Sequence, residues 1–224
     1  MVAPGPWPPW WESPSDSDLA AVLAQLGRHP QGMVAVAARC RFGRPTVVVT
    51  APVVDGRAGR PEPFPTTFWL TCPYLVEAVS RLESTGWIAR ISQAIKADPA
   101  ARQALRAAHE GAARLRSSLL TREMTRRLER LSPAAVQRLA QVGVAGSRQR
   151  EAVKCLHAHL ADHLGRSGNP VGRRVAALLA ERGVWLSGSP ACASEDARLS
   201  AEGRCLQVDA PAPYNRGDLS DARS

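Results

Sequence analysis

The sequence lacks the features that mark membrane-spanning, secreted or disulfide-rich proteins. It contains no apolar run long enough to cross a bilayer, and residues 1–17 have neither the basic start nor the apolar stretch of a signal peptide. The five cysteines are odd in number and include no Cys-x-x-Cys pair. That usage argues against a disulfide framework and for thiols or metal ligands. We therefore expect a cytoplasmic protein.

Lysine is nearly absent. Lys96 and Lys154 are the only two lysines, so arginine supplies nearly all of the basic charge. The formal net charge is +9 and the sequence pI is about 10.3. A positive potential of this size predicts weak association with anions such as nucleic acid or polyphosphate, whatever the fold. Aromatic residues form no repeat that would indicate a base-stacking surface.

Residue patterning predicts three strands and a series of helices. Residues 33–39, 46–50 and 64–71 are rich in β-branched, aromatic or alternating apolar residues, with turn residues between them. Residues 55–63 are rich in Gly, Pro and Arg and are expected to form a loop. Capping residues and apolar periodicity predict helices that begin near Asp16 or Ser17, Cys72, Ile88, Asp98, Ser132, Arg148 and Asn169.

These elements predict an α+β fold. We expect a single domain over residues 17–186, in which a small antiparallel sheet of about three strands is packed by five to seven helices. The Trp- and Pro-rich head, residues 1–16, and the polar tail, residues 187–224, are expected to be disordered.

Chemistry-bearing residues concentrate in residues 153–161, where a thiol, two imidazoles and a lysine fall within three helical turns. In a helix running from about Arg148 to Leu164, Cys155 and His159 stand one above the other, with His163 a further turn along. Two more cysteines, Cys40 and Cys72, follow predicted strands. The sequence gives His109 no partner.

Zinc requires four nitrogen or sulfur ligands in a tetrahedron, and iron-sulfur clusters require mostly thiolates. The predicted ligands, which must come from three separate segments, are Cys40, Cys72, Cys155 and His159, with His157 as the substitute ligand. Zinc is the favoured cofactor and an iron-sulfur cluster the alternative. The competing interpretation is that these thiols fill core space, because cysteine is among the most buried residue types.

The helical wheel leaves the surroundings of these residues open. Cys155, His159, Asp162 and His163 lie on a different arc from the apolar stripe of the same helix, so they face either another layer of the protein or solvent. Asp162 is placed to orient a neighbouring imidazole, although an exposed carboxylate is the expected role.

A second hypothesis makes Cys72 the nucleophile of a thiol-dependent enzyme. A thiol at a helix N-terminus feels the positive end of the helix dipole, which lowers its pKa and favours the thiolate. A histidine between residues 157 and 163 would act as the base, and Lys154 or an arginine would hold an anionic substrate. Ordinary capping by Cys72 and Pro73 is the competing explanation.

A third hypothesis is a basic binder of nucleic acid or polyphosphate. The helix that begins near Asp98 continues into a stretch whose outer faces are expected to carry Arg102, Arg106, Arg114, Arg116, Arg122, Arg126, Arg127 and Arg130. Acidic residues are interleaved with them, namely Glu110, Glu123 and Glu129. That mixture favours a solvated, salt-bridged face.

Four segments together resemble a known family. They are Arg39-Cys40-Arg41-Phe42-Gly43-Arg44-Pro45, residues 64–73 (FPTTFWLTCP), Ser80-Arg81-Leu82-Glu83, and Val153-Lys154-Cys155-Leu156-His157-Ala158-His159 with Asn169-Pro170-Val171-Gly172. This combination is similar to the bacterial family called domain of unknown function 501 (DUF501), of the actinobacterial type, over roughly residues 33–183. The resemblance implies no defined activity. Neighbouring genes in that family imply a cell-division or polyphosphate context.

Overall fold

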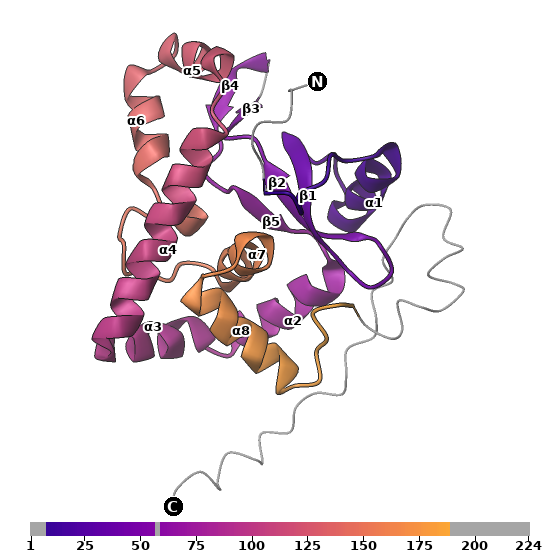
Figure 1. Ribbon diagram of the computed structural model, residues 1–224, viewed down its shortest axis with the longest axis vertical. Helices are drawn as coiled ribbons and strands as arrows, with labels where there is room; N and C mark the ends of the chain where they lie inside the picture. Colours follow the sequence, from indigo (N-terminus) through magenta and orange to yellow (C-terminus); the bar gives the residue numbers. More distant parts are fainter. Residues whose placement is uncertain (1–7, 57–58, 189–224) are drawn as a thin grey trace, which may run out of the picture.

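The computed structural model describes residues 8–56 and 59–188, and all structural statements refer to them. Within this part of the chain, eight α-helices accompany two small antiparallel sheets (Figure 1). The predicted α+β class is confirmed, with one helix more than the upper expectation. Almost all of the predicted tail, from residue 189 onward, lies outside the described residues.

The main sheet has the antiparallel order β1-β2-β5, formed by β1 (Met33–Arg39), β2 (Pro45–Thr50) and β5 (Phe68–Leu70). The first two strands lie where the β-branched residues predict them. The third is shorter than the predicted residues 64–71. A second, two-stranded sheet pairs β3 (Val53–Asp55) with β4 (Pro61–Pro63), where a loop was expected.

The helices begin at capping residues in most cases. Ser15 forms a capping box with Asp18, and the side chains of Asp98 and Asn169 accept from the first turns of their helices. Cys72 is an N-cap residue, as predicted. The helices are α1 (Asp16–Leu26), α2 (Pro73–Ser84), α3 (Trp87–Ala97), α4 (Pro99–Ser118), α5 (Arg122–Glu129), α6 (Pro133–Gln141), α7 (Leu156–Arg166) and α8 (Pro170–Ala180).

Helix α7 occupies the centre of the molecule, between the main sheet and helices α2 and α8 (Figure 1). It packs against β1, β2 and β5 on one side and against α8 and α2 on the other. Leu156, Leu160 and Ala161 are therefore fully buried, and so are the polar residues His159 and Asp162. Because neighbours surround this helix, His159 and Asp162 face other layers of the protein, whereas Cys155 and His163 on the same arc stay partly exposed.

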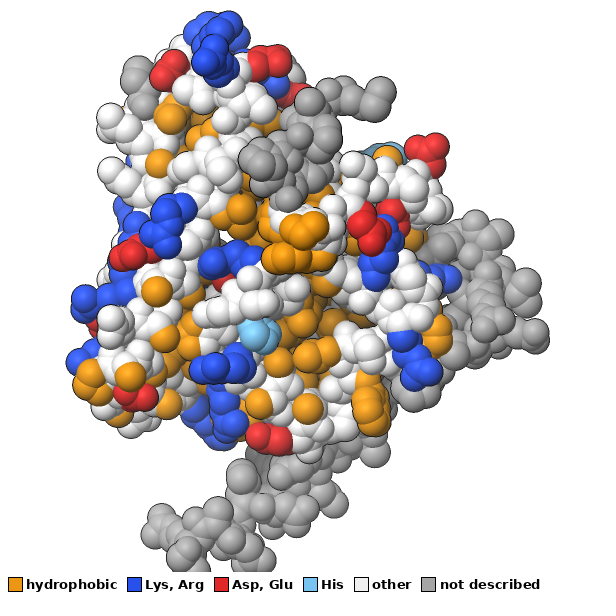
Figure 2. All heavy atoms as spheres, viewed as in Figure 1, with side chains coloured by type: hydrophobic (Ala, Val, Ile, Leu, Met, Phe, Trp, Pro, Cys, Tyr) orange, Lys and Arg blue, Asp and Glu red, His pale blue; other side chains and the backbone are white. Residues whose placement is uncertain are grey.

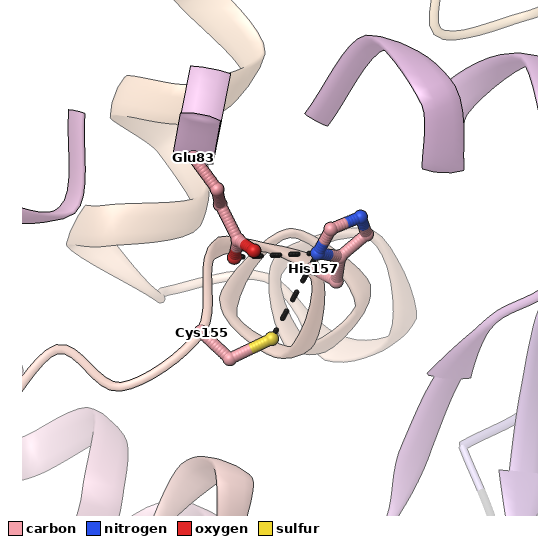
Figure 3. Close-up of side chains that lie close together, drawn as sticks. All are labelled: Glu83, Cys155 and His157. Carbon is pink, nitrogen blue, oxygen red and sulfur yellow. Dashed lines mark hydrogen bonds and ion pairs between the residues drawn. The ribbon is translucent and has the colours of Figure 1, made fainter. Parts of the chain in front are cut away.

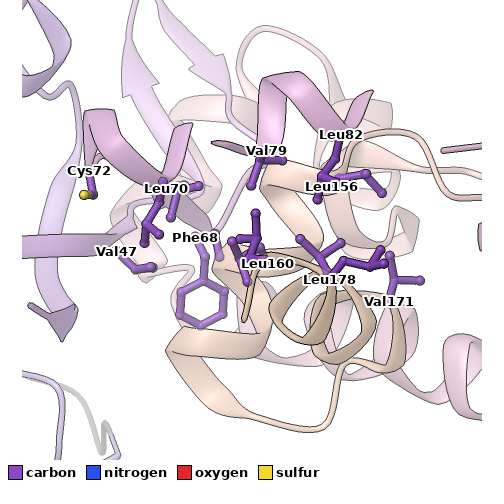
Figure 4. Close-up of a cluster of buried hydrophobic side chains, with 14 of the residues drawn as sticks. Val47, Phe68, Leu70, Cys72, Val79, Leu82, Leu156, Leu160, Val171 and Leu178 are labelled. Carbon is purple, nitrogen blue, oxygen red and sulfur yellow. The ribbon is translucent and has the colours of Figure 1, made fainter. Parts of the chain in front are cut away.

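One apolar cluster joins the sheet to the helices. Figure 4 shows side chains from β2, β5, α2, α7 and α8 meeting in it, among them Val47, Phe68, Val79, Leu160 and Leu178. Trp11 belongs to the same cluster, although residues 1–16 were expected to be disordered. Its ring packs edge-on against Phe68 at 5.5 Å between centroids, and its Nε1 donates to the Gly165 carbonyl at 2.9 Å. A tryptophan with these contacts anchors the start of the described chain to the core.

Among the described helices, none combines the length and the apolar character that a bilayer crossing requires.

Candidate metal centre

Three side chains of different chemistry meet where the end of α2 approaches the start of α7. Figure 3 shows Glu83, Cys155 and His157 directed toward one another. One carboxylate oxygen, the sulfur and one ring nitrogen all lie within 4.8 Å of each other. The distance from Nδ1 of His157 is 3.9 Å to the Cys155 sulfur and 3.2 Å to Oε1 of Glu83. All three residues are partly exposed, so the cluster is accessible to solvent.

The backbone at Cys155 decides which histidine its thiol meets. Cys155 is the N-cap residue of α7 and is extended, with φ −153° and ψ 120°. The predicted helix from about Arg148 was therefore wrong at its start, because the helix begins only at Leu156. The expected stacking of Cys155 over His159 does not occur, since it requires both residues to be helical. The thiol contacts His157 instead.

A backbone carbonyl fixes the orientation of His157. Nε2 lies 3.0 Å from the Val76 carbonyl oxygen, which only accepts, so Nε2 carries a proton and donates it. In the neutral ring, Nδ1 is then a lone pair that faces a carboxylate and a sulfur. Burial lowers the pKa of His157, but the hydrogen bonds to Cys155 and Val76 and the charge of Glu83 outweigh it and raise the pKa to about 9. A proton or another cation is favoured between these groups.

Glu83 has a second role besides facing His157. Its Oε1 accepts the backbone N–H of Leu156 at 2.6 Å, which satisfies one of the unpaired amides at the start of α7. The sequence hypothesis did not include Glu83 in the site. Its only signal was the segment Ser80-Arg81-Leu82-Glu83, which contributes to the family resemblance but has no ligand spacing of its own.

The other predicted ligands lie elsewhere. Among the described residues, the group within one ion's reach contains neither Cys40, nor Cys72, nor His159. Cys40 is half-buried just after β1, and its Cβ lies close to Gly188. Cys72 is 5% exposed and belongs to the apolar core beneath α2. The predicted four-ligand set therefore does not converge, because the strand ends and the start of α7 point to different places.

His159 is part of a separate buried network. Its Nδ1 lies 3.0 Å from Nδ2 of Asn169, and its ring meets His109 edge-on at 5.6 Å between centroids. Burial lowers the pKa of each histidine to about 4, so both are neutral near pH 7. Asp162, which was expected to be exposed, is 2% exposed and pairs with Arg166 at 2.7 Å. Asn169 also donates to this carboxylate at 2.8 Å.

The fold and the cluster together define an α+β protein with a candidate Cys/His/Glu metal centre. A family model described as Protein of unknown function (DUF501) matches residues 36–177. The chain belongs to that family, and the matched segment includes all three residues of the cluster. No curated protein and no solved structure matches the chain.

Proposed function

We propose that Glu83, Cys155 and His157 bind zinc. The observation that carries the proposal is the convergence of an oxygen, a sulfur and a nitrogen donor within 4.8 Å. Bond lengths of about 2.0 to 2.3 Å in a zinc tetrahedron place neighbouring ligand atoms roughly 3.3 to 3.5 Å apart. The separations of 3.2 and 3.9 Å at His157 need to adjust by only a few tenths of an ångström.

The surroundings of His157 also support a metal ligand. Metal-bound histidines generally donate their second ring N–H to a carbonyl or carboxylate, which holds the ring in place. The Val76 carbonyl has this role for Nε2 of His157. Three protein ligands leave a fourth position for water or substrate, which is typical of zinc sites that carry out chemistry. An iron-sulfur cluster is disfavoured, because the group supplies only one thiolate.

Metal analysis and titration of the purified protein test the proposal. We expect one zinc per chain, and binding of Co²⁺ to the metal-free protein with a sulfur-to-cobalt charge-transfer absorption. Because zinc must displace the proton held between His157 and Glu83, its affinity should rise with pH. Cys155→Ser and His157→Gln should each weaken zinc binding by at least about tenfold, as expected when a ligand is lost.

Cys40→Ser is the matched control, since Cys40 is a half-buried thiol outside the cluster. It should bind zinc like the wild type. Absence of stoichiometric zinc binding, or loss of zinc in Cys40→Ser but not in Cys155→Ser, would contradict the proposal.

The contact between Cys155 and His157 favours a second candidate, a thiol-dependent enzyme with Cys155 as nucleophile. Nδ1 of His157 lies 3.9 Å from the Cys155 sulfur, where the imidazole can serve as the base beside a thiol nucleophile. Cys72, the nucleophile predicted from the sequence, is 5% exposed and offers an external substrate little access. In the metal-free protein, iodoacetamide should modify Cys155 faster than Cys40 near neutral pH, and His157→Gln should remove this difference. Equal rates for the two thiols would argue against this candidate.

A further inference from the structure

A second site lies beside α7, at the edge of the apolar core, since Phe68 belongs to both. A small cavity opens between the segment before β5, helix α4, the 3₁₀ turn Val144–Gly146 and helix α7. It encloses about 10 Å³, which is room for one atom the size of a water oxygen. Its polar lining comes from Thr66, Thr67, Arg116 and Asp162.

Two of these side chains have buried polar atoms that find no partner among residues 8–56 and 59–188. Arg116 is 1% exposed, although the helical pattern assigned it to an outer face. Its Nη atoms donate to the carbonyls of Leu139, Val142 and Gly143 at 2.7 to 3.1 Å, but within the described residues its Nε–H has no acceptor. The Thr67 hydroxyl is likewise buried and has no hydrogen-bond partner in the described part of the chain. Both side chains line the cavity.

The charges around the cavity are unbalanced. Three arginines lie in this region: Arg116, Arg150 and Arg166. The positive charge of Arg150 lowers the pKa of Arg116, and the charges of Arg150 and Arg166 lower the pKa of His109. The charge of Asp162 acts on Arg116 and Arg166, and its oxygens already accept from Arg166 and Asn169. The ion pairs of the described residues include no carboxylate partner for Arg116 or Arg150.

His109, which lies beside the cavity, adds no charge of its own. Nδ1 of His109 accepts the Val144 N–H at 3.0 Å, so its other ring nitrogen carries the single proton and donates to the Ala152 carbonyl. The ring is therefore neutral, and the interior next to the cavity keeps an excess of positive charge. Arg116 shares the charge of Asp162 with Arg166, and a buried positive charge that is only partly compensated is unfavourable, which makes the site attractive to an anion.

We propose that this cavity binds one anionic atom, either a halide ion or one oxygen of inorganic phosphate, held by the Nε–H of Arg116 and the hydroxyl of Thr67. The size of the enclosed space admits a single atom of this class. Phosphate would place one oxygen inside and the remainder at the mouth. The site shares no residue with the proposed zinc cluster, so either proposal can fail alone.

Thermal unfolding of the full-length protein in chelator, at constant ionic strength, tests the proposal. Sodium chloride, sodium bromide and sodium phosphate are compared with sodium gluconate as the reference salt. We expect chloride and bromide, or phosphate, to raise the unfolding temperature in a saturable way, as for any ligand that binds only the folded state. The anion that raises the unfolding temperature shows whether the cavity binds a halide ion or a phosphate oxygen.

Thr67→Val removes the hydroxyl and keeps the shape of the side chain. It should weaken the apparent anion affinity at least tenfold, whereas Thr67→Ser should retain it. In gluconate, Thr67→Val should unfold no earlier than the wild type, because it removes a buried hydroxyl without a partner. Thr125→Val, in α5 and outside the cavity lining, controls for general screening of the basic protein.

Two results would overturn the proposal. One is an equal, non-saturating response of the wild type to all four anions, which would indicate screening alone. The other is an anion response that is unchanged in Thr67→Val, which would show that the anion binds at a different part of the protein.

Discussion

Gly165 shows how closely the centre of the molecule is packed at single residues. It lies in α7 between two aromatic side chains, since Trp11 donates to its carbonyl and the Phe68 ring covers its Cα. A Cβ atom at this position would overlap the Phe68 ring. The residue is helical, so its requirement for glycine comes from space and not from backbone conformation.

We therefore predict that Gly165→Ala destabilises the protein by about 1 to 3 kcal/mol, the usual cost of overpacking a core. Phe68→Leu removes the ring atoms that the new methyl group meets, so the double variant should lose less than the sum of the two single variants. Urea unfolding of all four proteins measures this coupling. Strictly additive losses would mean that Phe68 is not the obstacle.

At the scale of elements, the start of α7 depends on a contact distant in sequence. Glu83, at the end of α2, accepts the N–H of Leu156, the first residue of the helix. The order and class of most elements were predictable, because caps such as Asp98 and Asn169 and the strands at residues 33–39 and 46–50 have local signals. A capping residue that comes from another helix, as Glu83 does, has no local signal in the sequence. The sequence therefore placed the helix start too early and paired Cys155 with His159.

We predict that Glu83→Ala and Glu83→Gln differ in stability but share the loss of zinc affinity. Alanine leaves the Leu156 amide without its acceptor and should cost about 1 to 3 kcal/mol in the free energy of unfolding of the metal-free protein. Glutamine keeps an amide oxygen as acceptor and should cost clearly less. Both variants remove the carboxylate and should weaken zinc binding.

Glu77→Gln is the control, because Glu77 lies in the same helix and, within the described part of the chain, its carboxylate pairs with the partly exposed Arg81 alone. It should change neither stability nor zinc binding appreciably. Equal stability losses in Glu83→Ala and Glu83→Gln would indicate that the charge of Glu83, and not capping, stabilises the start of α7.

At the scale of the whole molecule, the position of each arginine relative to the core decides whether its charge is available to an anionic ligand. The arginines of α4 do not form one outer face: Arg106 pairs with Glu151 and Arg114 with Glu110, while Arg116 is buried. Helical periodicity could not separate these cases, since it does not show which neighbours cover a helix. Affinity for nucleic acid or polyphosphate stays a prediction from the net charge of +9.

The buried histidines predict how the stability of the whole molecule varies with pH. Because burial lowers the pKa of His109 and His159 from 6.5 to about 4, the unfolded chain binds more protons than the native protein between these values. The contribution of these two histidines to stability should therefore be fully present above pH 6.5 and fall as the pH drops toward 4. Each histidine contributes up to about 1.4 kcal/mol per pH unit. Asp162, whose pKa burial raises, acts in the opposite direction.

His109→Asn isolates the contribution of one ring, because the asparagine oxygen can replace Nδ1 as acceptor for the Val144 N–H. Whatever its overall stability, this variant should show a shallower decline of the unfolding free energy between pH 6.5 and 4, measured by urea unfolding in chelator. His29→Asn, at an exposed position, should retain the wild-type slope. If His109→Asn also retains the wild-type slope, protonation of the buried ring does not account for the loss of stability toward pH 4.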